Sequence, residues 1–89
     1  MKHIVKRGRH AQAYDERKLY ASIYAACLSV RVPAGTAELV SAQAVGAVNN
    51  WLTPKHEVTA NDIRRVAHKY LKVLNQDAAY MYLHHRVVW

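Results

Sequence analysis

Residues 57–71 read EVTANDIRRVAHKYL and carry the strongest structural signals in the chain. Thr59 is followed three residues later by Asp62, which is the spacing of a capping box at a helix start, with Asp in place of the usual Glu. Apolar residues then recur every three or four positions, as along one face of a helix. They are Ile63, Val66, Ala67, Tyr70, Leu71 and Leu74. The stretch therefore predicts a short strand at residues 57–58 and an amphipathic helix over residues 60–74.

Two helices are expected before this stretch. Asp15 is placed to cap a helix over about residues 15–30, whose apolar positions are spaced for one face. Pro33 indicates a loop after it, and Thr36 is placed to cap a second helix over residues 36–52. The inward face of that second helix would use Val40, Ala44, Val48 and Trp51 or Leu52.

The two ends of the chain add a hairpin and a last helix. Residues 3–14 contain two short extended segments, HIVKR and HAQAY, and Gly8 between them can adopt the positive φ that closes a turn. Asn75 is placed to start a helix over about residues 76–87. The predicted fold class is α+β and mostly α, a four-helix bundle with a small sheet made of the hairpin and one short strand. We expect residues 1–89 to form a single domain.

The charge balance indicates an anionic partner. Lys and Arg number 13 and Asp and Glu number 6, which leaves a net charge of +7 on 89 residues. Such a surplus favours nucleotides, nucleic acids, acidic proteins or membrane surfaces as partners. The alternative is that the charge serves solubility alone.

Cysteine usage and hydropathy indicate a cytoplasmic protein. Cys27 is the one cysteine, so the chain can form neither an internal disulfide nor a cysteine-based zinc site. Because Cys27 lies in an apolar stretch, we expect a small buried hydrophobe rather than a reactive thiol. No apolar stretch is long enough to span a bilayer, and the polar N-terminus does not resemble a signal peptide.

The sequence offers no catalytic constellation. The serines at residues 22, 29 and 41 lie within expected helices without a glycine elbow, and no phosphate loop of the GxxxxGK type is present. The histidines lack the spacing of metal ligands on a helix, so no metal site is expected. They are His3, His10, His56, His68, His84 and His85. We therefore expect no enzyme.

The basic hairpin is the clearest candidate for binding. Lys6 and Arg7 precede its turn, Arg9 and His10 follow it, and Lys18 lies in the first turn of the next helix. A cation in the first turn opposes the helix dipole unless an anion lies nearby. Basic side chains beside a helix N-terminus can form a phosphate site. The alternative is a solvated basic face.

Three segments in this order resemble the ATP-cone domain over about residues 3–86. The first is VKR, a short turn, an aromatic residue, Asp and then KL; the second is EVTANDIRRVAHKYL; the third is DAAYMYLHHR. The resemblance implies a bundle of four helices capped by a three-stranded sheet. It also implies a site for ATP or dATP, with or without Mg²⁺, between the sheet and the helices.

The resemblance further implies regulation rather than catalysis. ATP-cones usually lie at the N-terminus of ribonucleotide reductases, where ATP permits activity and dATP switches it off through altered oligomerisation. They also occur in a bacterial repressor of reductase genes. We therefore expect an allosteric domain that binds an adenine nucleotide and acts through self-association or a reductase subunit.

Phosphate contacts follow from the resemblance residue by residue. Lys6 and Arg7 match the strand pair that reaches the nucleotide phosphates, and Lys18 matches the helix lysine that holds phosphate. Arg64 matches a residue that points to the phosphates in some members. Residues 6–9 read KRGR where many members read KRDG, which predicts a different turn or a different closure of the hairpin.

Contacts to the base and sugar follow in the same way. Gln12 falls where many members have a glutamate near the base or ribose, and Tyr14 occupies the aromatic position beside it. Asp15 matches a polar residue that often contacts the adenine. Thr59 and Ile63 match a segment that flanks the base.

Two other functions fit the same residues. A basic helical module that binds nucleic acid, such as a transcription-regulatory domain, would share the charge surplus and bind with a steep salt dependence. Against it, the charge is divided between the hairpin and the helix over residues 60–74, which carries Arg64, Arg65, Lys69 and Lys72. The last alternative is a bundle that binds a protein partner and no ligand.

Overall fold

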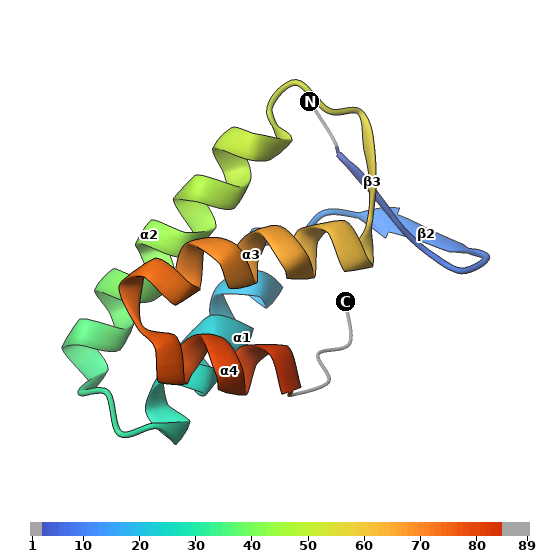
Figure 1. The fold of residues 1–89 in the computed structure, drawn as a ribbon. Coiled ribbons are helices and arrows are strands. Elements are labelled where there is room, and N and C mark those ends of the chain that lie inside the picture. The colour runs from blue at the N-terminus through green and yellow to red at the C-terminus, as the bar shows by residue number, and fades with distance from the viewer. Residues whose placement is uncertain (1–2, 85–89) are drawn as a thin grey trace.

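The computed structural model describes residues 3–84, which form four helices and a small sheet (Figure 1). In chain order the elements are β1 (Ile4–Arg7), β2 (His10–Ala13), α1 (Glu16–Ser29), α2 (Ala34–Leu52), β3 (Glu57–Thr59), α3 (Ala60–Leu74) and α4 (Gln76–His84). The sheet lies beside the N-terminal end of α3, and its hairpin projects past the helices (Figure 1). The predicted class, mostly helical with a small three-stranded sheet, is confirmed.

The sheet is mixed, with the strand order β2-β1-β3. β1 runs antiparallel to β2 and parallel to β3, and Lys6 pairs with Thr59 in the parallel register. Gly8 closes the hairpin at a φ of 59°, a conformation that glycine adopts without strain. Val5 and Val58 are paired and buried, so one face of the sheet packs on the core while alternate residues face away from it.

The junction between β3 and α3 is a capping box. The Thr59 hydroxyl accepts a hydrogen bond from the backbone N–H of Asp62 at 3.0 Å. The backbone N–H of Thr59 donates in return to the Asp62 carboxylate at 3.2 Å. The two bonds satisfy donors that a helix start leaves free, and α3 begins at the residue that the sequence predicted.

The core lies where the four helices meet the inner face of the sheet. α1 packs against α2 and α4, and α3 packs against the same two helices. From α3, Ile63, Ala67 and Leu71 are fully buried, whereas Tyr70 and Leu74 lie at the edge and stay partly exposed. The other buried apolar residues come from every element except β2; among them are Leu19, Ile23, Ala44, Val48, Leu52, Ala78, Ala79 and Tyr82.

The predicted start of the second helix is wrong. α2 begins at Ala34 with Pro33 as its N-cap, so Thr36 is an exposed residue inside the first turn and caps nothing. The Pro33 carbonyl accepts from the N–H of Ala37 at 2.8 Å, and this backbone bond starts the helix without a capping side chain. A proline there has a suitable φ and no N–H that needs a partner.

The inward face of α2 is broader than the predicted stripe. Ala44, Val48 and Leu52 are buried as expected, but Val40 and Trp51 are only partly buried. The additional buried residues are Ala37, Ser41 and Val45. Because α1 and α3 both pack against α2, its contact surface covers more than one narrow stripe.

Two further expectations concern the cysteine and the chain end. Cys27 is fully buried as predicted, and burial raises the pKa of its thiol, which keeps it protonated and unreactive. Within the described ranges, no helix has the length and apolar character needed to cross a membrane. The expected helical residues 85–87 and the end of the DAAYMYLHHR segment lie outside the described residues.

Leu71→Ala should lower the free energy of unfolding by about 2–5 kcal/mol, because it leaves a cavity in a fully buried site. Urea unfolding followed by circular dichroism measures the change. Val73→Ala is the matched control on the same helix, since Val73 is 84% exposed, and it should change stability by less than about 0.5 kcal/mol. Equal losses in the two variants would contradict the placement of α3.

Asp62 should make stability depend on acid pH. Its pKa lies below the ordinary value of 3.8, chiefly because the Thr59 backbone N–H donates to the carboxylate. A lowered folded-state pKa contributes stability above the unfolded value, and that contribution is lost as the pH falls below about 3.8.

Thermal unfolding from about pH 7 to about pH 2 tests this. Asp62→Asn should melt lower at neutral pH and show a shallower fall in Tm below about pH 4. Asp77→Asn is the control, because Asp77 is an exposed first-turn residue of α4, and this variant should keep the full fall. An unchanged acid profile in Asp62→Asn would refute the role of the capping box.

Candidate nucleotide-binding site

The candidate residues line two pockets next to the sheet. The β1–α3 pocket, of about 380 Å³, is lined by Lys6, Arg7, Gly8, Thr59, Ala60, Asn61 and Arg64. The α1–α2 pocket, of about 730 Å³, lies where α1 begins and α2 ends. Its walls include His3, Ala13, Tyr14, Asp15, Glu16, Arg17, Lys18 and Asn49. Because His3 and Ala13 flank the base of the hairpin and Gly8 is its turn, both pockets border the hairpin.

The β1–α3 pocket gathers positive charge at a helix start. Lys6 and Arg7 come from β1 and Arg64 from the second turn of α3, while Ala60 and Asn61 contribute the first turn of that helix. The backbone N–H groups and dipole of a helix N-terminus favour anions. Among residues 3–84, neither Arg7 nor Arg64 forms an ion pair. The arrangement suits phosphate, which both guanidinium groups can bind through paired N–H donors.

Lys6 differs from the two arginines because it already has a partner. Its Nζ lies 3.2 Å from Oε1 of Glu57 on the neighbouring strand, and both side chains are half exposed. A surface ion pair of this kind contributes about 0–1 kcal/mol. A bound phosphate can therefore compete with Glu57 for the Lys6 ammonium at small cost.

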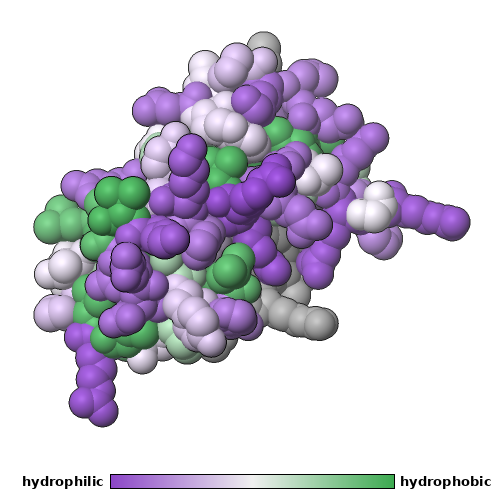
Figure 2. Space-filling view, viewed as in Figure 1, coloured by the Kyte–Doolittle hydropathy of each residue, from purple (hydrophilic) through white to green (hydrophobic). Residues whose placement is uncertain are grey.

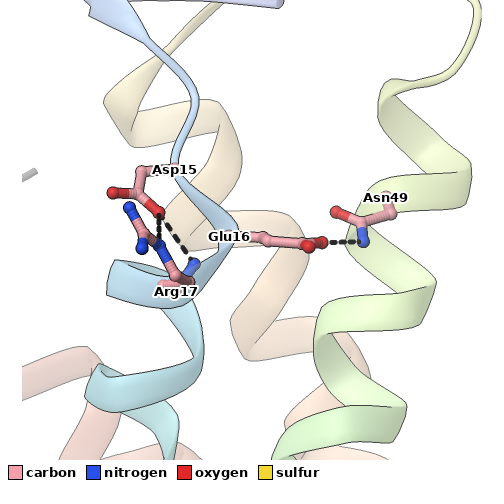
Figure 3. A network of polar contacts seen from close by, with 4 residues as sticks. All are labelled: Asp15, Glu16, Arg17 and Asn49. Atoms are coloured by element: carbon pink, nitrogen blue, oxygen red, sulfur yellow. Dashed lines mark hydrogen bonds and ion pairs between the residues drawn. The ribbon is translucent and has the colours of Figure 1, made fainter.

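The α1–α2 pocket contains a chain of polar contacts. The Tyr14 hydroxyl donates to Oδ1 of Asn49 at 2.9 Å, and Nδ2 of Asn49 donates to Oε2 of Glu16 at 2.7 Å. Figure 3 shows Glu16 reaching from α1 across to Asn49 on α2. Burial, followed by the negative charges of Glu16 and Asp15, raises the pKa of Tyr14, so its phenol stays protonated and remains a donor.

Asp15 and Lys18 complete this pocket at the start of α1. The Asp15 carboxylate accepts from the backbone N–H of Arg17 at 3.0 Å and from its Nε at 3.4 Å (Figure 3). The backbone hydrogen bond is the main reason that the pKa of Asp15 is lowered, so the cap is ionised at neutral pH. Lys18 is exposed on the same turn.

The structure thus brings the predicted residues together in two groups. Lys6, Arg7, Thr59 and Arg64 line the β1–α3 pocket, and Tyr14, Asp15 and Lys18 line the α1–α2 pocket. Gln12 is exposed on β2 and lines neither pocket. Ile63 is fully buried in the core and lines neither pocket, so it anchors the first turn of α3 and is not exposed to a ligand.

The sequence did not indicate three of the wall residues. Asn49, Glu16 and His3 were not predicted as site residues, although NN near the end of an apolar helix was a visible polar signal. The ring Nδ1 of His3 lies 2.6 Å from the carbonyl oxygen of Lys55 and donates to it. Asn49 lies 35 residues from Tyr14 in the sequence, so no pattern of neighbouring residues could predict their contact.

The hydropathy of the molecular surface differs between the two ends of the molecule (Figure 2). Hydrophilic side chains cover much of α3 and the projecting hairpin, and hydrophobic side chains gather at the opposite end of the bundle (Figure 2). Within the described part of the chain, no three His, Cys, Asp or Glu side chains are grouped to hold a metal ion.

Comparisons with protein-family models, curated proteins and solved structures found no match.

Tyr14→Phe should lower Tm by about 4 °C, because it leaves the partly buried Asn49 acceptor without its donor. Differential scanning calorimetry measures the change. Tyr80→Phe provides the matched control, since Tyr80 is 61% exposed, and its Tm should equal that of the wild type. If both variants melt with the wild type, the Tyr14–Asn49 bond does not stabilise this pocket.

Proposed function

We propose that this chain is a regulatory domain that binds ATP or dATP, with the phosphate chain in the β1–α3 pocket. The observation that carries the proposal is the convergence of Lys6, Arg7 and Arg64 on the first turn of α3. The resemblance to ATP-cone domains supports it, because the VKR and VTANDI segments are the ones that line this pocket.

Charge compensation explains how a triphosphate would be held. Three cations and the N-terminus of α3 offset a charge that is otherwise costly to remove from water. Mg²⁺ bound to the phosphates would neutralise the remainder. Two of the lining residues already have partners: Lys6 has its exposed pair with Glu57, and Thr59 forms the capping box with Asp62.

The base and sugar are assigned to the start of α1. Tyr14 offers an aromatic ring, Asp15 an acceptor, and Lys18 a further cation for the phosphates. Because both pockets border the hairpin, a nucleotide that reaches from one to the other would contact the hairpin along its length. Occupancy would then change the position of the hairpin, and the effect would pass to a second copy or to a reductase subunit in the cytoplasm.

A nucleic-acid-binding module is the second candidate. The hairpin projects from the bundle, and every residue of β2 is exposed (Figure 1). Arg7, Arg9 and His10 lie around its turn, and a two-stranded ribbon of this kind fits the major groove of DNA. This function predicts binding that weakens steeply with salt and requires no adenine base.

Thermal unfolding with ATP, dATP and GTP at fixed protein concentration tests the leading proposal. A ligand at about a hundred times its Kd adds roughly 2.7 kcal/mol of stability, which corresponds to a rise in Tm of about 11–22 °C for a domain of this size. ATP or dATP should give this rise and GTP a much smaller one. No rise with either adenine nucleotide would refute the proposal, and tight salt-sensitive binding to DNA would favour the second candidate.

Single substitutions then locate the ligand. Arg64→Ala and Lys18→Ala each remove one cation from one proposed end of the nucleotide, and each should weaken ATP binding at least tenfold. Lys72→Ala removes the same charge from the last turn of α3, which lines neither pocket, and should keep the wild-type Kd. An equal loss in all three variants would indicate attraction by net charge rather than a defined site.

A further inference from the structure

The outer edge of β2 (His10–Ala13) is paired with no other strand among residues 3–84. The strand order is β2-β1-β3, so β2 has β1 on one side only. Every residue of β2 is exposed, and the hairpin projects past the helices (Figure 1). Unpaired N–H and C=O groups along such an edge form a template for another strand. The edge is therefore a candidate interaction surface.

The hydrogen bonds of the hairpin show which residues face this edge. The Tyr14 N–H donates to the His3 carbonyl at 2.8 Å, so the backbone groups of Tyr14 point toward the β1 side. Because the backbone groups of an antiparallel strand alternate in direction, those of Gln12 also point toward β1. The N–H and C=O groups of Ala11 and Ala13 then point outward.

The sequence of β2 leaves this edge open to another strand. Proteins commonly protect an edge strand with proline, lysine or a bulge. β2 reads HAQA, which contains neither proline nor lysine, and its register with β1 runs without a bulge. The outward backbone groups belong to alanines, whose small side chains allow close approach. The other edge strand, β3 (Glu57–Thr59), is shorter and continues directly into α3.

We propose that β2 pairs antiparallel with β2 of a second copy of this chain, so that the two sheets become one continuous sheet about a two-fold axis. Ala11 would lie opposite Ala13 of the second copy, and each would exchange its N–H and C=O with the other. Gln12 would then lie on the axis, opposite Gln12 of the second copy. The inference goes beyond the proposed function and does not depend on a bound nucleotide.

The charges at the two ends of β2 favour a second copy as the occupant. Arg9 precedes the strand and Asp15 follows it, so the antiparallel register with Ala11 opposite Ala13 places Arg9 opposite Asp15 of the second copy. Opposite charges directly across a strand pair stabilise it. The bonds of Asp15 to Arg17 use Oδ1, so its other carboxylate oxygen can accept from Arg9. Since Asp15 lines the α1–α2 pocket, the second copy would add a cation to the rim of that pocket.

The dimer is expected to be weak and reversible. Two short strands bury far less than the roughly 1,200–2,000 Å² of a stable interface. The net charge of +7 on each chain also opposes association. At about 0.15 M salt the Debye length is about 8 Å, so repulsion between distant charges is screened while the backbone hydrogen bonds remain. The dimer should therefore form at high protein concentration and moderate salt.

Sedimentation equilibrium without nucleotide, at about 0.15 M salt and from about 10 µM to about 1 mM protein, tests the pairing. The wild type should pass from monomer to dimer over this range. Ala11→Pro removes an outward N–H and should stay monomeric, with a Tm close to that of the wild type, because an edge strand tolerates proline where its N–H faces solvent. Ala11→Val keeps the N–H and should dimerise like the wild type.

A disulfide at the two-fold axis tests the register. Residues in a non-hydrogen-bonded antiparallel pair have Cα atoms about 4.5 Å apart, which a disulfide can span, so Gln12→Cys should form a covalent dimer under mild oxidation. The native Cys27 is fully buried and does not compete. Gln43→Cys is the matched control, because Gln43 is exposed on α2, and it should crosslink at least about tenfold more slowly.

Charge reversal tests the choice of partner. Arg9→Glu places like charges opposite each other at both ends of the strand pair and should raise the dimer Kd about threefold or more. Lys72→Glu makes the same charge change on α3 and should not raise it. An unchanged Kd in Arg9→Glu would overturn the assigned register.

The outcomes separate this inference from the proposed function. A wild type that is monomeric up to about 1 mM overturns the inference and leaves the edge to a strand of another protein, while the nucleotide titration still decides the proposed function. A dimer that persists in Ala11→Pro, or equal crosslinking rates in Gln12→Cys and Gln43→Cys, places the contact elsewhere and also overturns the inference.

Discussion

The reciprocal hydrogen bonds between Thr59 and Asp62 are the constraint on which the rest of the structure depends. Thr59 ends β3 and caps α3 at the same time, so strand and helix share one residue without a linker. Because Thr59 pairs with Lys6 in the sheet, the first turn of α3 lies beside the cations of β1. A register shift of one residue would turn Val58 out of the core, so burial fixes the alignment that builds the pocket.

Local signals made most of the fold predictable. The capping box of α3 and the Asp15 cap of α1 involve residues at most three apart, and the buried stripe of α3 repeats every few residues. The start of α2 could not be predicted in this way, because Pro33 begins it through a backbone carbonyl and no capping side chain marks the place. The wide buried face of α2 depends on two partner helices that local spacing does not reveal.

The candidate site likewise contains residues that local sequence could predict and contacts that it could not. Lys6, Arg7 and Thr59 could be proposed from short segments because the chain places them on adjoining strands. The Tyr14–Asn49–Glu16 chain joins the start of α1 to α2 across more than thirty residues of sequence. Such features arise from tertiary packing, so they can be found only after the helices are placed.

The size of the domain gives ligand binding a large effect. Folded domains are stable by about 5–15 kcal/mol, so a well-bound ligand contributes a sizeable share of the total. Under the proposed function, the hairpin is the element that binding would stabilise most directly, because β2 is exposed throughout and is held mainly by its pairing with β1. Arg7 and Arg64 both line the β1–α3 pocket, and an anion bound there would offset their like charges. A phosphate chain bound as proposed would thus stabilise the exposed hairpin and change the surface that a partner contacts.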